Sequence, residues 1–164
     1  MKNSLPELDR PEFSVQDAVH LLEEQYELCC TLEELPGERD RNYLARDSSS
    51  DSYVLKISNS CETLEFLKVQ SIALESAAML LEKGRIPSVY PNKNGESLSR
   101  IRSEDGSLHW MRLVHYVDGL PMAEYRPHTR EFLLELGAMC GTVTKALHKI
   151  PLRTLDRRLL WEMH

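Results

Sequence analysis

The sequence lacks any long apolar run, and its start lacks one as well. The opening residues Met1-Lys2-Asn3-Ser4-Leu5-Pro6 do not contain the hydrophobic region of a secretory signal peptide. No segment approaches the roughly 20 consecutive apolar residues that cross a bilayer. We therefore expect a cytoplasmic protein with no membrane partner.

Cysteine and histidine are present without the spacings that bind metals. The four cysteines contain no C-x-x-C pair, and the six histidines contain no H-x-x-x-H pair. Adjacent residues on a strand point to opposite faces, so Cys29 and Cys30 cannot share one side. The pattern predicts free, buried thiols and no zinc site.

The chain also lacks an excess of basic residues. Its 20 Lys and Arg face 26 Asp and Glu, giving a net charge of -6. A nucleic-acid surface is normally basic, so the balance argues against a nucleic-acid partner. The 164 residues, 41% of them hydrophobic, suffice for one ordinary domain with a core or for a small domain with an appendage.

Among the features that are present, residues 27–58 form the segment around which the rest of the chain is arranged. Apolar and polar residues alternate over 26–32, the period of a half-buried strand, and Pro36-Gly37 then breaks the pattern. A polar turn over 46–52 precedes a strand that ends Tyr53-Val54-Leu55-Lys56-Ile57-Ser58. Because strand side chains alternate, Lys56 projects on the same face as Val54.

The glycine turn has the composition of an anion site. Gly37 bares the backbone amides of the loop, and Arg39 and Arg41 flank it, with Asn42 next in sequence. Oriented amides and guanidinium groups both favour anions. The turn is therefore a candidate cover for phosphate groups.

Three helices are predicted around these strands. Ser14 is a candidate N-cap with Asp17 three residues on, for a helix that ends near residue 25. A long helix is predicted over 62–83, with Gly84 and Pro87 as its stop and exit. Its expected inner side contains Leu64, Leu67, Ile72, Leu74, Met79 and Leu80. A third helix is predicted from residue 128 or 129 to 149, followed by a basic and then apolar end with Leu159, Leu160 and Trp161.

A further hairpin is predicted between the second and third helices. Asp105-Gly106 separates two alternating segments, which is a strong hairpin signal. The emerging strand, 108–116, is expected at the cleft beside Lys56. Asp118-Gly119 and Pro121 then end it.

These motifs, in this order, resemble a known family. Tyr53-Val54-Leu55-Lys56 has the frame of the V-A-I-K strand of protein kinases. Together with Gly37-Glu38-Arg39-Asp40-Arg41-Asn42, it resembles the N-terminal lobe of the aminoglycoside phosphotransferase and choline kinase-like family. The sequence of residues 37–42 is most similar to that of hydroxylysine kinase-like members, including those fused to class III aminotransferases. The resemblance spans roughly residues 20–150.

The resemblance implies an α+β fold with three parts. Residues 1–25 form an extension and helix, and 26–116 form a nucleotide-binding lobe in which an antiparallel sheet of about five strands packs with a long helix. Residues 117–164 form a hinge and the first helical part of an incomplete C-terminal lobe. The apolar third helix would then face the missing lobe, and its exposed patch would favour a homodimer.

It also implies residue roles. Lys56 would contact the phosphates of ATP, and a helix glutamate would hold the lysine. We choose Glu75, which lies two turns into the predicted helix, with Glu62, Glu65 and Gln70 as alternatives. The family register would place the acid near Ile72, where this chain departs from the family and has no carboxylate.

The backbone of the hinge would hydrogen-bond the adenine edge. The positions that carry over from the family for this are Val114, His115 and Tyr116.

The family's catalytic H-G-D and N loop and its later acidic metal motif do not occur in this chain. We therefore expect Mg²⁺ ligands and catalytic residues in a missing lobe, and no catalysis from this chain alone. Pyridoxal phosphate is implied only if an aminotransferase domain is fused. The phosphate acceptor stays open among amino alcohols, hydroxy amino acids, sugars and aminoglycosides.

Three functions are weighed. The first is the nucleotide-binding portion of an ATP-dependent small-molecule kinase. The second is a non-catalytic kinase-like regulatory or assembly module of a multidomain protein. The third, an unrelated α+β binding domain, is disfavoured by the order of strand, lysine, long helix, hairpin and hinge.

Overall fold

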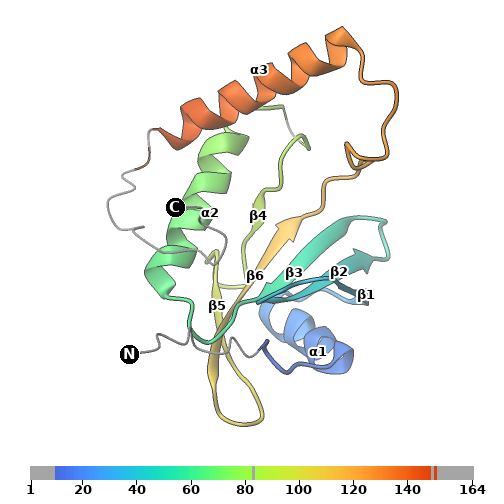
Figure 1. Cartoon of the computed structure of the whole chain (residues 1–164). Coiled ribbons are helices and arrows are strands. Elements are labelled where there is room, and N and C mark those ends of the chain that lie inside the picture. Colours follow the sequence, from blue (N-terminus) through green and yellow to red (C-terminus); the bar gives the residue numbers. More distant parts are fainter. Residues whose placement is uncertain (1–9, 83, 149, 151–164) are drawn as a thin grey trace, which may run out of the picture.

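A computed structural model describes residues 10–82, 84–148 and 150 of the chain. This part has the expected α+β fold, with three helices and one antiparallel sheet of six strands (Figure 1). The helices are α1 (Val15–Tyr26), α2 (Leu64–Ala78) and α3 (Arg130–Leu147). The strands are β1 (Cys30–Leu35), β2 (Arg41–Asp47), β3 (Ser52–Ile57), β4 (Val89–Tyr90), β5 (Ser99–Arg102) and β6 (Leu108–His115).

The sheet runs in the order β1-β2-β3-β6-β4, and β5 also pairs with β6. β6 therefore lies in the interior of the sheet, beside β3 as the sequence predicted. Both predicted hairpin turns are present. Asp47 closes the β2–β3 turn, and Gly106, with φ of 88°, lies in the β5–β6 turn.

α1 begins as the sequence predicted and ends one residue later. The Asp17 amide donates to Ser14 Oγ at 3.1 Å, and the Ser14 amide donates to the Asp17 carboxylate at 2.7 Å, which together make a capping box. The expected strand over 26–32 is wrong in its first half. Ala18, Leu22 and Tyr26 form the buried stripe of α1 at intervals of one turn, so Tyr26 follows the helical period.

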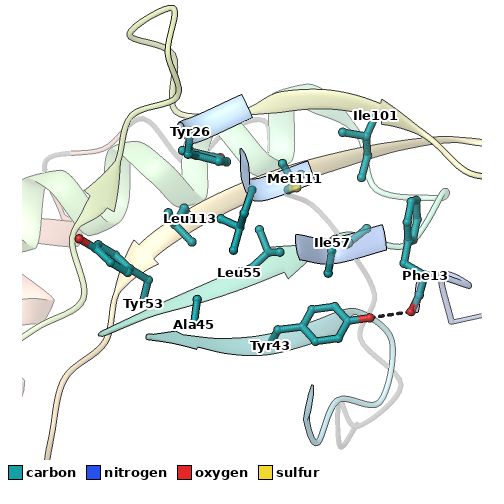
Figure 2. Close-up of a cluster of buried hydrophobic side chains, with 12 residues drawn as sticks. Phe13, Tyr26, Tyr43, Ala45, Tyr53, Leu55, Ile57, Ile101, Met111 and Leu113 are labelled. Atoms are coloured by element: carbon teal, nitrogen blue, oxygen red, sulfur yellow. Dashed lines mark hydrogen bonds between the residues drawn. The ribbon is translucent and has the colours of Figure 1, made fainter. Parts of the chain in front are cut away.

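The core lies between α1 and one face of the sheet (Figure 2). It contains Tyr43 and Ala45 of β2, Tyr53, Leu55 and Ile57 of β3, and Met111 and Leu113 of β6. Tyr43 OH donates to the Phe13 carbonyl at 2.6 Å, which ties the segment before α1 to the sheet. Since alternate residues occupy this core, their neighbours face the other side.

α2 is shorter than the predicted helix over 62–83, and most of its expected inner side is not buried. Leu67 is 2% exposed, whereas Ile72 is 48% and Met79 83% exposed. The reason is that α2 packs mainly along α3 and touches the sheet through few residues, so tertiary placement overrides the apolar stripe (Figure 1).

α3 begins at the Thr129 N-cap, as expected, and is largely exposed; Leu133 is 49% and Leu134 62% exposed. Lys149 and the apolar end with Leu159, Leu160 and Trp161 lie outside the described residues. No helix in the described part is long and apolar enough to span a membrane.

The four cysteines are free, as predicted, but three are exposed and Cys30 is half-buried. The expectation of buried thiols is therefore wrong. Cys61 and Cys140 lie on the outside of a loop and of α3, and Cys29 lies in the link between α1 and β1.

Candidate functional site

The strand register brings three polar residues into one row on the face opposite α1. Asn42 of β2 is the partner of Lys56 of β3, and Lys56 is the partner of Arg112 of β6. Directly paired residues of antiparallel strands lie on the same face, with Cβ atoms about 5 Å apart. This polar row therefore places two cations and an amide side by side.

An apolar row lies next to it. Leu44, Val54 and Val114 are partners across the same three strands, and Val89 of β4 extends the row. Two residues along a strand correspond to about 7 Å. The face thus offers an apolar strip beside a cationic strip, an arrangement that suits a ligand with a flat apolar part and an anionic part.

Lys56 is half-buried and forms no ion pair with any described residue. Burial lowers the pKa of Lys56, and neighbouring Arg112 lowers it further, while Asp40 opposes the shift. A partly desolvated lysine without an ion-pair partner is suited to a ligand anion.

The glycine turn folds onto the end of the polar row. A Cβ on Gly37 would lie 2.5 Å from Asn42 Nδ2 and 2.5 Å from the Asp40 carbonyl oxygen, so glycine is needed for this close approach. Asn42 Nδ2 donates to the Pro36 carbonyl at 3.4 Å. Asn42 Oδ1 is buried and accepts no hydrogen bond within the described part of the chain.

The two arginines of the turn are placed differently. Arg39 pairs with Glu62 at 3.3 Å, and both side chains are largely buried. Arg41 alternates with Asn42, so it lies on the opposite face, where it pairs with Glu34 at 2.6 Å and donates to the Pro11 carbonyl. Arg41 therefore does not join the Lys56 face, and the expectation that both arginines flank one anion site is corrected.

Glu75 does not reach Lys56 in this structure. It is exposed on α2 and forms no ion pair among the described residues. α2 approaches the sheet through its N-terminal half, where Gln70 Oε1 accepts from Arg112 Nη2 at 2.6 Å and Glu62, before the helix, pairs with Arg39. Two of the alternatives to Glu75 thus lie nearer the polar row, whereas Glu65 is exposed.

The expected hinge divides between the two faces. The Val114 side chain belongs to the apolar row, whereas the His115 ring contacts Tyr53 and Tyr90, with centroids 5.2 and 5.6 Å away. The His115 amide donates to the Ser88 carbonyl and the Tyr116 amide to the Ser52 carbonyl. The sheet therefore occupies both amide donors.

The described residues contain no group of three His, Cys, Asp or Glu side chains that could hold a metal ion. A groove of about 1110 Å³ lies by the segment before α1 and the β5–β6 turn, and its lining includes Arg10, Glu34 and Arg41 but not Lys56. The polar row is partly covered, since Lys56 is half-buried and buried Arg112 is bonded to Gln70 of α2.

No protein-family model and no curated protein matches the sequence. The solved structures that share the fold include two kinases. An amicoumacin kinase, hAmiN, in complex with AMP-PNP, Ca²⁺ and Ami superposes with a TM-score of 0.68 at 15% identity. A microcompartment-associated aminopropanol kinase superposes with a TM-score of 0.60 at 18% identity. The fold is that of a kinase-like N-terminal lobe.

Each match covers 91% of this chain and 45% of the other, so the chain spans about half the length of these small-molecule kinases. At these identities the likeness shows the fold alone. It agrees with the kinase-like fold implied by the sequence resemblance. The finer likeness to hydroxylysine kinases, and the aminotransferase fusion, stay predictions.

Sequence reasoning missed Arg112 as a site residue. A signal was present, since Arg112 is a charged residue in the alternating set with Trp110 and Val114 on a strand that is otherwise mostly apolar. The sequence does not show which residue of β3 lies opposite Arg112. That pairing depends on register, which the fold determines.

Proposed function

We propose that this chain is the nucleotide-binding N-terminal portion of an ATP-dependent small-molecule phosphotransferase. The observation that carries the proposal is half-buried Lys56, which forms no ion pair with a described residue and lies beside the apolar row of Leu44, Val54 and Val114. The kinase-like fold supports it. Adenine would lie on the apolar row, and phosphate oxygens would meet Lys56 and the turn at Gly37.

The roles of the remaining candidate residues follow from this placement. Asn42, in the polar row, and Arg39, on the glycine turn, would shape the phosphate end, whereas Arg41 is left out. The hinge at Val114 to Tyr116 would contact adenine through carbonyl oxygens, because the amides of His115 and Tyr116 are already engaged. Glu75 would reach Lys56 only if α2 moved.

The wider features of the parent protein belong to the same proposal. Its acceptor would be an alcohol group of a small molecule, held by a C-terminal lobe that covers α3. That lobe would supply the Mg²⁺ ligands, since the described residues offer no metal site. Pyridoxal phosphate enters only with an aminotransferase fusion. The parent is proposed as a cytoplasmic protein without a nucleic-acid or membrane partner.

A titration of the full chain with ATP and Mg²⁺ tests the proposal. Replacing Lys56 with alanine removes a charge-assisted contact, so we expect ATP affinity to fall about 10- to 100-fold. Lys93→Ala, an exposed lysine whose backbone bonds to Gln25 behind the sheet, is the matched control and should bind like wild type. Equal affinities of wild type and Lys56→Ala would contradict the role of Lys56.

The second candidate is a non-catalytic kinase-like module, which the exposed position of Glu75 favours. Kinase activity needs the strand lysine held by a helix carboxylate. This candidate predicts that wild type binds ATP no better than inorganic tripolyphosphate. A clear preference for ATP over tripolyphosphate would contradict it.

A further inference from the structure

Arg112 is a buried cation whose hydrogen-bonding capacity is mostly unused. Its side chain lies on β6 in the interior of the sheet, and the residue is 7% exposed. A guanidinium has five N–H donors, yet Nε and Nη1 are buried and donate to no acceptor within the described residues. Within the described part of the chain, only Nη2 has a partner, the neutral amide oxygen of Gln70 at 2.6 Å. Burying a charge with so few partners is costly, which points to a missing anion.

The charges around Arg112 do not balance. Asp40 and Glu62 interact electrostatically with Arg112, and Asp40 also with Lys56. Glu62 is at the same time the ion-pair partner of Arg39. Among the described residues this cluster, defined here as Lys56, Arg112, Arg39, Asp40 and Glu62, has three cations and two carboxylates. One positive charge is left over.

Strand pairing places two of the three cations next to each other. Lys56 and Arg112 are direct partners on β3 and β6, and like charges placed opposite one another on a sheet are destabilising. Burial lowers the pKa of Arg112, as it does that of Lys56, so desolvation already opposes both charges. An anion between the two would relieve the repulsion and give Arg112 a charged acceptor.

We propose that Arg112 is a second phosphate-binding residue of the Lys56 face, which takes a phosphate oxygen in place of the Gln70 amide. The proposal depends on the proposed function for the identity of the phosphate as part of a nucleotide. The partly buried Arg112–Gln70 bond is the accessible end of the guanidinium. A charged oxygen is a stronger acceptor than a neutral amide, so the exchange is favourable.

If the phosphate replaces Gln70, substitutions of Arg112 and of Gln70 should have opposite effects on phosphate binding. Removing Arg112 would remove a ligand contact, whereas removing the Gln70 amide would remove a competitor. A purely structural role, in which the pair only ties α2 to the sheet, would give both substitutions the same effect. Comparing the two variants therefore separates the readings.

The experiment titrates the full chain with ATP, adenosine and inorganic tripolyphosphate. We expect Arg112→Gln to weaken ATP binding about 10- to 100-fold and adenosine binding less than twofold. Arg112→Lys, which keeps the charge, should recover most of the loss. Gln70→Ala should bind ATP as tightly as wild type or more tightly. Arg100→Gln, an exposed arginine on β5, is the matched control and should change nothing.

Folding is checked by thermal unfolding of each variant, and Arg112→Met serves as a second probe if Arg112→Gln unfolds. Wild-type ATP affinity in a folded Arg112→Gln or Arg112→Met variant would overturn the inference while leaving the Lys56 result standing. Equal losses for Arg112→Gln and Gln70→Ala would overturn it as well. If tripolyphosphate binds as tightly as ATP and Arg112→Gln weakens both, the anion site is supported and the nucleotide function fails instead.

Discussion

At the scale of single residues, close contacts require a glycine at position 37, whereas the backbone conformation there does not. Its φ is not positive, but an added Cβ would lie 2.5 Å from both Asn42 Nδ2 and the Asp40 carbonyl oxygen. The carbonyl belongs to the backbone and cannot move aside easily. The turn would have to open, and Asn42 would then shift relative to Lys56.

We therefore expect Gly37→Ala to lower the free energy of unfolding by roughly 1–3 kcal/mol, as overpacking does. Urea unfolding measures the change. Gly119→Ala is the matched control because nothing lies within 4 Å of its added Cβ. A Gly37→Ala variant as stable as Gly119→Ala would show that the turn is not packed in this way.

Lys56 and Arg112 show at the same scale why burial and charge must be considered together. Each is a long basic side chain, and each is partly or wholly removed from water on one face of the sheet. Either alone could be a packing residue with an extended aliphatic stem. Their position as direct strand partners, in a cluster with fewer carboxylates than cations, is the basis of the proposed anion site.

At the scale of elements, α1 is held at its start by the Ser14–Asp17 capping box and along its length by Ala18, Leu22 and Tyr26. Hydrogen bonds from Ser14 are the main reason that the pKa of Asp17 lies below its ordinary value of 3.8. A carboxyl group whose pKa is lowered by folding stabilises the fold above its ordinary pKa. It loses that contribution as pH falls through the lowered value.

Replacing Ser14 with alanine should cost about 1 kcal/mol of unfolding free energy at pH 7, the usual value of an N-cap. The difference from wild type should shrink below pH 3.8, the ordinary value for Asp17, as the carboxylate takes up its proton. Urea unfolding at several pH values measures both effects. Ser48→Ala in the exposed β2–β3 turn is the control and should stay within about 0.5 kcal/mol of wild type. A cost at pH 7 no larger than that of Ser48→Ala would refute the capping role.

At the scale of the whole molecule, apolar burial is uneven among the described residues. α1 and the sheet enclose the described core, whereas α3 leaves Leu133 and Leu134 about half or more exposed. Leu120 and Met122, in the link before α3, are exposed too. Apolar area of this kind marks a surface that another chain or domain covers.

In the absence of another partner, we expect the chain to self-associate through α3. Sedimentation equilibrium should show a molar mass that rises with concentration. A Leu133→Gln, Leu134→Gln double variant should remain monomeric at the same concentrations. Val15→Gln, which changes an exposed apolar residue on α1, should behave like wild type. If the α3 substitutions leave the association unchanged, the interface lies elsewhere and the prediction is wrong.

The sequence was sufficient for local structure. The Ser14 cap, the Pro36-Gly37 break, the Asp105-Gly106 hairpin and the start of α3 each depend on contacts between near neighbours, and each is confirmed. Period-2 alternation also put Lys56 and Val54 on one face. These features need only backbone sterics, capping and side-chain direction.

The predictions that were wrong, and the residues that were missed, depend on contacts between residues far apart in the sequence. Tyr26 fits the residue pattern of either a strand or a helix. Its burial together with Ala18 and Leu22 places it in the helix. The length of α2 and the exposure of Ile72 and Met79 follow from where α2 meets α3. The position of Glu75 relative to Lys56 depends on how α2 approaches the sheet, which the residues of α2 alone do not determine.

The sequence by itself determined the kinds and order of the elements and the lysine that ends the third strand. Only the tertiary structure decided that Arg112 lies opposite Lys56, that Arg41 faces away, and that Gln70 meets Arg112. The physical reason is that a strand carries its alternation within its own residues. Its register against another strand is set by long-range packing.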